Sequence, residues 1–212
     1  MGKGKSDYLK KKKRRRRRNE KYEKKEGFKM LTYEEKKFWE NFKLGNIRPI
    51  DQLIKNNYDV AAVKLICSAI DILAGFLIGR TTKAKIGKSF EIFLKKYMPI
   101  FFKYDLGELS FRKDNKPVES PAIILYFCYR NGLIHDGSLG LGVELYRDPN
   151  HEMLYSAFGI KIMRLSVIGF WEYFKKAINS YEEDLKKDIE IYRKFQEKFI
   201  DISQPIFVLK QT

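Results

Sequence analysis

One long apolar segment constrains the fold more than any other feature of the sequence. It reads AAVKLICSAIDILAGFLIG and spans residues 61–79. A helix whose apolar residues cover most of its faces must be buried, either in a protein core or in a membrane. Lys64, Ser68 and Asp71 interrupt the segment, and charged groups are costly inside a bilayer. The segment therefore predicts a core helix of a protein with no membrane partner.

The polar residues of this segment follow a helical period. Lys64, Ser68, Asp71 and Gly75 are separated by four, three and four residues, so they form one polar stripe along a helix expected from about Asp59 to Gly79. One interpretation of the stripe is a partly exposed edge of the helix. The other is that Asp71 faces a polar cleft of the bundle, where it would support a functional site.

Signals for helix ends delimit two further helices. Thr32 followed by Glu35 is a capping-box pattern that begins a helix, and Gly45 offers a stop for it. A later helix is expected from Ile86 to about Lys103, and Pro99 is expected to kink it or end it early.

The segments that follow predict another helix and a hairpin. SPAIILYFCYRN restarts a helix, with Ser120 as the N-cap and Pro121 at the first helical position. VELYR and HEMLY then flank Asp148, Pro149 and Asn150, and the pattern is typical of a β-hairpin.

The C-terminal part carries a helical pattern from about residue 161 onward. From Trp171 to Phe199, apolar and aromatic residues recur at alternating three- and four-residue steps, and only Asp188 breaks the series. This spacing predicts one amphipathic helix, with a seam of about eight turns. Such a helix would reach beyond a compact bundle, so we expect a homodimer. Packing of the seam within one chain is the alternative.

Together these elements predict an all-α protein. We expect a helical bundle with a small β-hairpin inserted before the last long helix. A chain of 212 residues suits one such domain with appendages. The expected division is a disordered basic arm at residues 1–28, the helical domain at 29–187 and a C-terminal helix extension at 188–212.

The N-terminal arm is intensely basic. The chain has a formal net charge of +16, and residues 1–26 hold fourteen Lys or Arg and four Asp or Glu, a net of +10 that leaves +6 for the remaining 186 residues. A block of like charges repels itself and buries nothing, so the arm is expected to be disordered alone. We expect it to bind the phosphates of RNA or DNA. A solubilising tail, or nuclear import in a eukaryotic host, is the alternative. The consecutive basic residues are Lys10, Lys11, Lys12, Lys13, Arg14, Arg15, Arg16, Arg17 and Arg18.

Composition and motifs predict a cytoplasmic protein with no metal and no cofactor. The charged N-terminus lacks the apolar stretch of a secretory signal. Cys67 and Cys128 lie in apolar helical patterns without CxxC spacing, so both are expected to be reduced core residues. The sequence has no Cys/His cluster and no HExxH, and its glycine-rich 137–142 region lacks the GK[ST] of a P-loop.

The stretch YRNGLIHDG, residues 129–137, holds the residues best suited to catalysis. Histidine changes protonation near neutral pH and can move a proton to or from a ribose hydroxyl or a leaving oxygen. Arginine stays charged and can clamp a phosphate as charge builds in the transition state. Arg130 and His135 are therefore candidates for phosphodiester chemistry, and Asn131 could orient the histidine or bind the phosphate.

The spacing of Arg130 and His135 needs an explanation. On an ideal α-helix, residues five apart point about 140° away from each other. The two can share a site only if the helix breaks or if two chains contribute. Gly132 offers such a break, because glycine readily adopts the left-handed conformation that ends helices.

An apolar helix that ends in Arg130 and Asn131, with His135 five residues after the arginine, resembles the signature of the HEPN superfamily of small helical bundles. SAIDILAGFLIG, an aromatic third helix and LYFCYRNGLIH together resemble a prokaryotic branch of that group over roughly residues 46–185. The resemblance implies a metal-independent endoribonuclease, usually dimeric, whose two motifs meet at the twofold axis. It also implies a role as a toxin or in phage defence, with an antitoxin or a larger complex as a further partner.

Three functional interpretations follow. The first is this enzyme, in which the ribose 2′-hydroxyl attacks its own phosphate and leaves a cyclic phosphate end. The second is a non-catalytic helical module that binds nucleic acid, and the third is a basic-tailed subunit of a larger nucleoprotein complex. At the residue level, Arg130 could instead cap helix carbonyls and pair with Asp71, and His135 could be a loop histidine bonded to backbone. His151, at the expected hairpin turn, would simply be exposed.

Overall fold

The computed structural model of the protein describes most of the chain beyond the basic arm. The described residues are 31–79, 86–103, 112–113, 116–117, 121–137, 139–140, 143–147, 154–156 and 163–203. The expectations for the arm, including Lys10 to Arg18, and those for Ser120 and His151 lie outside these residues.

The described residues fold mainly into helices, which confirms the all-α class and the helical bundle. In chain order the helical elements are α2 (Tyr33–Phe42), η1 (Lys43–Ile47), α3 (Arg48–Lys55), α4 (Asp59–Ile78), α5 (Ile86–Tyr97), η2 (Pro99–Phe102), α6 (Pro121–Ile124), η3 (Leu125–Asp136), α7 (Val167–Lys187) and α8 (Ile189–Ser203). Elements η1 and η3 are π-helical, and η2 is a 3₁₀ turn. Pro99 ends the regular part of α5 as expected, and Pro121 begins α6.

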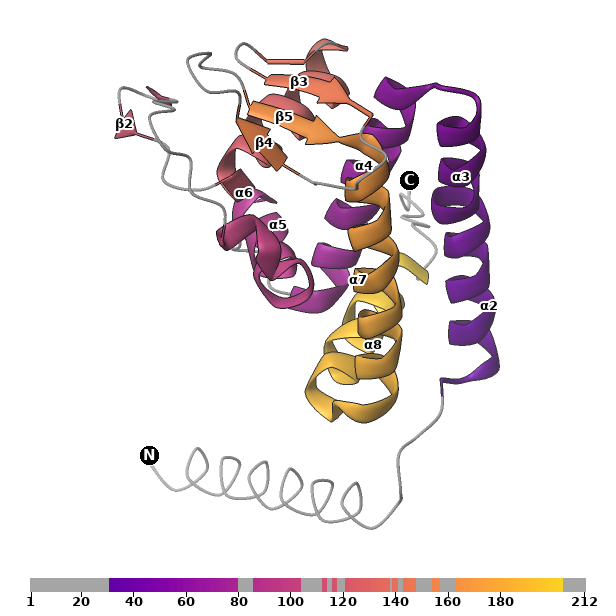
Figure 1. Ribbon diagram of the computed structural model, residues 1–212. Coiled ribbons are helices and arrows are strands. Elements are labelled where there is room, and N and C mark those ends of the chain that lie inside the picture. The colour runs from indigo at the N-terminus through magenta and orange to yellow at the C-terminus, as the bar shows by residue number, and fades with distance from the viewer. Residues whose placement is uncertain are drawn as a thin grey trace, which may run out of the picture.

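Helix α4 is the central helix of the bundle and contacts α3, α5, α7, α8 and η3 (Figure 1). Its apolar residues are largely buried, whereas Lys64 is exposed and Ser68 and Asp71 are partly exposed. The expected polar stripe is therefore confirmed. Among the described residues, α4 alone is long and apolar enough to cross a membrane by length and composition, but 56% of its apolar window is buried inside the protein. A core position explains its apolar character.

Helix α2 begins at the predicted capping box but does not stop at the predicted glycine. The Thr32 backbone N–H donates to Glu35 Oε2 at 2.8 Å, and the Glu35 N–H donates to Thr32 Oγ1 at 3.3 Å. Gly45 instead lies within η1, which continues into α3. The stop at Gly45 was wrong because glycine permits a left-handed end without requiring one. Burial of Ile50 on α3 favours continuation of the helix past Gly45.

The expected single C-terminal helix is two helices. Asp188 adopts an extended conformation with φ −111° and ψ 105°, and its Oδ1 accepts hydrogen bonds from the N–H groups of Glu190 at 2.9 Å and Ile191 at 3.2 Å. Asp188 therefore acts as the N-cap of a new helix rather than as a minor interruption. Helix α8 then packs on α4 and α7, with Tyr192 and Phe195 buried. The seam is thus covered within the chain, and helix length no longer argues for a dimer.

A small sheet lies at one end of the bundle (Figure 1). Its strands β3 (Val143–Tyr146), β5 (Met163–Ser166) and β4 (Leu154–Ser156) lie in that order, with β3 parallel and β4 antiparallel to β5. A small β insertion before the last helices is confirmed. The hairpin expected around Asp148, Pro149 and Asn150 was wrong, because β3 and β4 each pair with β5 and not with each other. Residues 163–166 were expected to be helical, and they form β5 because both neighbouring strands pair with them. A second, two-stranded ladder joins β1 (Arg112–Lys113) to β2 (Lys116–Pro117).

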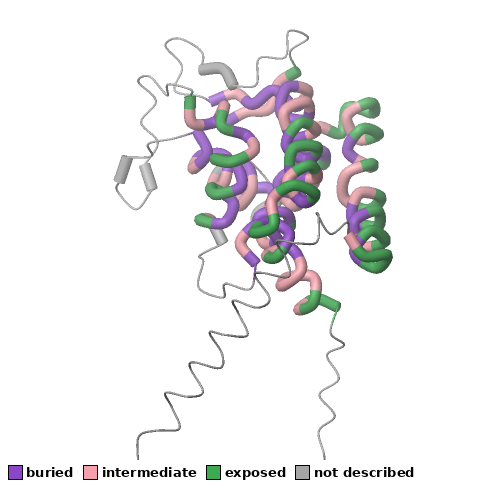
Figure 2. Tube along the Cα trace, turned by 90° about the horizontal axis from the view of Figure 1, so that it is seen from below, coloured by how far each residue is buried: buried purple, intermediate pink, exposed green. Residues whose placement is uncertain are grey.

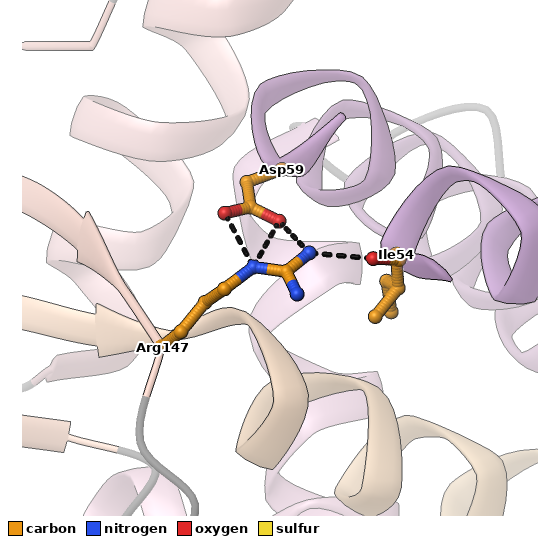
Figure 3. Close-up of polar contacts among 3 residues, drawn as sticks. All are labelled: Ile54, Asp59 and Arg147. Carbon is orange, nitrogen blue, oxygen red and sulfur yellow. Dashed lines mark hydrogen bonds and ion pairs between the residues drawn. The ribbon is translucent and has the colours of Figure 1, made fainter. Parts of the chain in front are cut away.

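Two sets of polar contacts fasten this sheet to the helices. Arg147, just after β3, donates from Nε to both carboxylate oxygens of Asp59 at 3.0 and 2.9 Å, and from Nη2 to the Ile54 carbonyl at 2.5 Å (Figure 3). The Tyr129 hydroxyl of η3 lies 2.9 Å from the carbonyl oxygens of both Glu144 and Met163. The sheet therefore holds η3 in place beside α4.

Candidate active site

Helices α4 and η3 bring Asp71 and Arg130 together. Arg130 Nε donates a hydrogen bond to Asp71 Oδ2 at 2.5 Å, and Arg130 Nη1 donates to Asn131 Oδ1 at 2.8 Å. Ion-paired hydrogen bonds of this kind are shorter and stronger than neutral ones. Three of the candidate residues, which the sequence places on two distant segments, therefore form one cluster.

A tyrosine supports the guanidinium from a different direction. Arg130 Cζ lies 5.3 Å from the centre of the Tyr126 ring, within the range of a cation–π contact. The Tyr126 ring meets Phe90 edge to face at a centroid distance of 5.3 Å. Gly87 of α5 also packs on this ring, since a Cβ at that position would lie only 3.0 Å from Tyr126 Cε1. Arg130 is thus held by Asp71, by Asn131 and by a ring that is itself fixed.

Sequence reasoning missed Tyr126 and Gly87. Tyr126 precedes Arg130 by four residues in the same helical segment, and this spacing could have indicated a shared face. Gly87 comes from another helix, so its contact with Tyr126 depends on the packing of α5 against η3, which no local pattern predicts.

The ion pair is mostly removed from solvent. The side chains of Arg130 and Asp71 keep 13% and 18% of their exposure. The sequence predicts either a polar cleft at Asp71 or a pairing of Arg130 with Asp71. The structure contains that pair, with a small part of each side chain still at the surface.

The helix that carries the motif is not broken at Gly132, so that expectation was wrong. Element η3 continues as a π-helix to Asp136, and Gly137 ends it with a positive φ of 69° and an N–H bond to the Gly132 carbonyl. Hydrogen bonds in a π-helix link residues five apart, so backbone positions five apart lie about one turn above each other. Positions 130 and 135 therefore lie on the same side of η3 without any break. The side chain of His135 lies outside the described part of the structure.

Burial raises the pKa of two groups beside this cluster. Cys67 is fully buried one turn before Asp71, and both burial and the nearby carboxylate raise the pKa of its thiol. The thiol stays protonated, and Cys67 is a free, buried cysteine as expected. Burial also raises the pKa of Tyr126, although the nearby Arg130 guanidinium acts in the opposite direction. The side chain of Cys128 lies outside the described residues.

Within the described ranges, no group of three or more His, Cys, Asp or Glu side chains is placed to hold a metal ion. No family model matches the chain, and no curated protein or solved structure matches it. A functional assignment therefore depends on the geometry of the cluster and on the resemblance of its motif.

Proposed function

We propose that the protein is a metal-independent endoribonuclease of the HEPN type that acts in the cytoplasm as a homodimer. The observation that carries the proposal is the cluster of Asp71, Arg130 and Asn131 on a π-helix that brings position 135 onto the same side as position 130. π-Helical turns are rare and are frequent at functional sites. A toxin or phage-defence role, controlled by an antitoxin or a larger complex, fits an RNA-cleaving activity of this kind.

The proposed reaction needs one proton-transfer group and one charge-stabilising group. The ribose 2′-hydroxyl attacks its own phosphate, the bond to the 5′-oxygen of the next nucleotide breaks, and a cyclic phosphate forms. The attacking 2′-hydroxyl loses its proton as the new bond forms, and the leaving 5′-oxygen gains a proton as its bond to phosphorus breaks. His135 carries out one of these two transfers and solvent water the other. Arg130 binds the phosphate and stabilises the charge that builds on it. Asn131 positions one of these groups, and Asp71 holds the arginine in a fixed orientation.

In this proposal the basic arm increases the affinity of the protein for RNA. Lys10 to Arg18 would contact RNA phosphates without regard to sequence and would release counterions as they bind. Because the phosphate charge is the same everywhere along a strand, the arm would bring RNA to the body and leave the choice of cleavage position to the folded site.

A second candidate function is favoured by the burial of the ion pair. Arg130 and Asp71 expose only 13% and 18% of their side chains, which also suits a purely structural pair. In that case the protein would be a non-catalytic module that binds RNA or DNA, or a basic-tailed subunit of a larger nucleoprotein complex.

Incubation of purified protein with labelled RNA in EDTA separates these functions. Cleavage by the parent protein and none by His135→Ala, with equal RNA binding by both, supports the enzyme. Binding without cleavage by either protein would refute the enzyme and support the binding module. Neither binding nor cleavage would favour the subunit of a larger complex.

A further inference from the structure

One side of helix α4 is open to solvent, whereas most of the helix is buried. Ala61 and Lys64 are exposed, and Ser68, Asp71 and Gly75 are partly exposed, at positions three or four residues apart. Most residues on the other sides of α4 are buried. Figure 2 shows buried residues gathered inside the bundle and exposed ones on its outer surface. We call these five residues the open stripe. Three of them are Ala, Ser or Gly, so a ligand can approach the helix backbone closely along the stripe.

The open stripe lies between two other helices. Element η3 contacts α4 at Asp71 through Arg130. Helix α8 contacts α4 near Gly75, where a Cβ would meet only Lys198 Cε, at 4.0 Å. The space above Gly75 is therefore open, and the stem of a lysine borders it.

Three basic side chains follow one another along this stripe. Lys64 lies two helical turns before Asp71, about 10 Å along the axis, and Gly75 with Lys198 lies one turn after it, about 6 Å further. Among the described residues neither Lys64 nor Lys198 has an ion-pair partner, in contrast to Lys186 and Lys187 on α7. The carboxylate of the stripe, Asp71, is paired with Arg130. The row of Lys64, Arg130 and Lys198 is therefore positive overall.

We propose that the open stripe binds a single-stranded RNA segment on both sides of the phosphate that Arg130 contacts. This inference rests on the proposed function, because that function places a phosphate at Arg130. A strand with a negative charge at every nucleotide matches a row of cations along one helix, and positively charged tracks of this kind follow the backbone of single strands. Lys64 contacts a phosphate on one side of the reacting nucleotide, and Lys198 contacts one on the other side.

The test measures how RNA binding by the full chain depends on salt. The probe is a fluorescent oligouridine whose 2′-hydroxyls are methylated, so that it cannot be cleaved. The stripe variant carries Lys64→Gln and Lys198→Gln. The matched control carries Lys37→Gln on α2 and Lys95→Gln on α5, which removes the same charge from two exposed lysines away from the stripe. Each phosphate contact on a single strand contributes about 0.7 to the slope of log Kobs against log salt. We expect the stripe variant to lower the magnitude of the slope by about 1.4 and the control to change it little.

Three results would overturn the inference. These are an unchanged slope in the stripe variant, an equal change in both variants, or an equal loss of binding to polyglutamate or duplex DNA. Cleavage of unmodified RNA is measured separately on the same proteins. A lowered slope without any cleavage by the parent protein would remove the proposed reaction and leave the RNA-binding stripe standing. Cleavage by the parent protein together with an unchanged slope in the stripe variant would remove the RNA-binding stripe and leave the proposed reaction standing.

Discussion

At the scale of single residues, the surroundings of Arg130 decide what the motif can do. Its guanidinium bonds to Asp71 at 2.5 Å and lies 5.3 Å from the Tyr126 ring centre. A catalytic arginine gains from such contacts, because a group held in one orientation loses little entropy when it binds a phosphate. The same contacts also stabilise the fold. The two roles can be separated only by variants that affect them unequally.

Asp71→Asn keeps the shape of the aspartate and removes its charge. We expect the free energy of unfolding to fall by about 2–3 kcal/mol, because the partly buried charge of Arg130 loses its counter-ion. Arg130→Gln should then cost clearly less in the Asp71→Asn background than in the parent protein, since paired residues are not additive. Urea unfolding of the two single variants and the double variant measures this coupling. Additive losses would contradict a stabilising Asp71–Arg130 pair.

Gly75 and Gly87 both lie in helices, and alanine substitutions at the two positions should have opposite effects on the melting temperature. Alanine in place of glycine ordinarily stabilises a helix by about 1 kcal/mol. At Gly75 the new Cβ would meet only one atom, at 4.0 Å, so Gly75→Ala should raise the melting temperature. At Gly87 it would lie 3.0 Å from Tyr126 Cε1, so Gly87→Ala should lower the melting temperature and weaken RNA cleavage, because the ring beneath Arg130 must move. Equal shifts in melting temperature for both variants would contradict the tight packing at Tyr126.

Sequence reasoning correctly predicted that Arg130, Asn131 and Asp71 lie close together. It did not predict the path of the backbone between the motif residues. It treated Gly132 and Gly45 as helix ends, and both lie inside π-helical elements. Glycine lowers the cost of ending a helix, but the packing of the flanking residues decides whether the helix ends. For Gly132 that packing includes Tyr129 on the sheet, a contact between segments that no local pattern contains.

At the scale of elements, the buried carboxylate of Glu35 joins α2 to α8 through hydrogen bonds. Glu35 is 3% exposed and accepts hydrogen bonds from the Tyr192 hydroxyl at 3.0 Å and from Gln196 Nε2 at 3.1 Å. The same carboxylate caps the start of α2 through the Thr32 N–H. The first helix after the basic arm is therefore tied to the last helix of the bundle by one side chain.

This tie should weaken in alkaline solution. Burial and the nearby Glu35 raise the pKa of Tyr192 to about 12, compared with about 10 for an unperturbed tyrosine. Because the folded pKa is the higher one, the contribution of Tyr192 is complete below about pH 10 and is lost as the pH rises toward 12. Tyr192→Phe should therefore lose less stability than the parent protein between about pH 10 and 12 in urea unfolding.

Exposed Tyr58 provides the control for that measurement, since Tyr58→Phe should follow the parent protein. An identical decline of stability with pH in the parent protein and in Tyr192→Phe would show that the contact with Glu35 does not carry the effect.

Elements with strong local signals were predictable, and those defined by distant partners were not. The capping box of α2 and the apolar run of α4 both agree with the structure. The spacing of apolar residues alone predicts one irregular position at Asp188 within a continuous seam, although Asp is a preferred N-cap residue. Strand β5 was missed because its four residues become a strand only by pairing with β3 and β4.

At the scale of the whole molecule, the remaining argument for a dimer is the resemblance of the motif. The C-terminal seam is covered within one chain, because α7 packs on α4 and α5 and α8 packs on α4 and α7. The π-helical geometry also brings positions 130 and 135 to one side of η3 within a single chain. We therefore expect each motif to be complete in one subunit and the two motifs to lie near the twofold axis.

Light scattering should give the mass of two chains at micromolar concentration.

A mixture of Arg130→Ala and His135→Ala proteins, denatured and refolded together, should remain inactive, because no subunit then has a complete motif. Recovery of cleavage in the mixture would contradict this expectation, since it requires a site that takes Arg130 from one subunit and His135 from the other.

The chemical form of the RNA ends tests the central claim most directly. The parent protein should cleave single-stranded RNA in EDTA and leave cyclic phosphate ends, which are identified by mass spectrometry of the fragments. Arg130→Lys and His135→Ala should each abolish these products, because both groups act on one transition state. Arg130→Lys keeps the charge beside Asp71 and thus serves as the variant with the smaller structural change. Linear phosphate ends, or cyclic ends that persist in either variant, would contradict cleavage by Arg130 and His135.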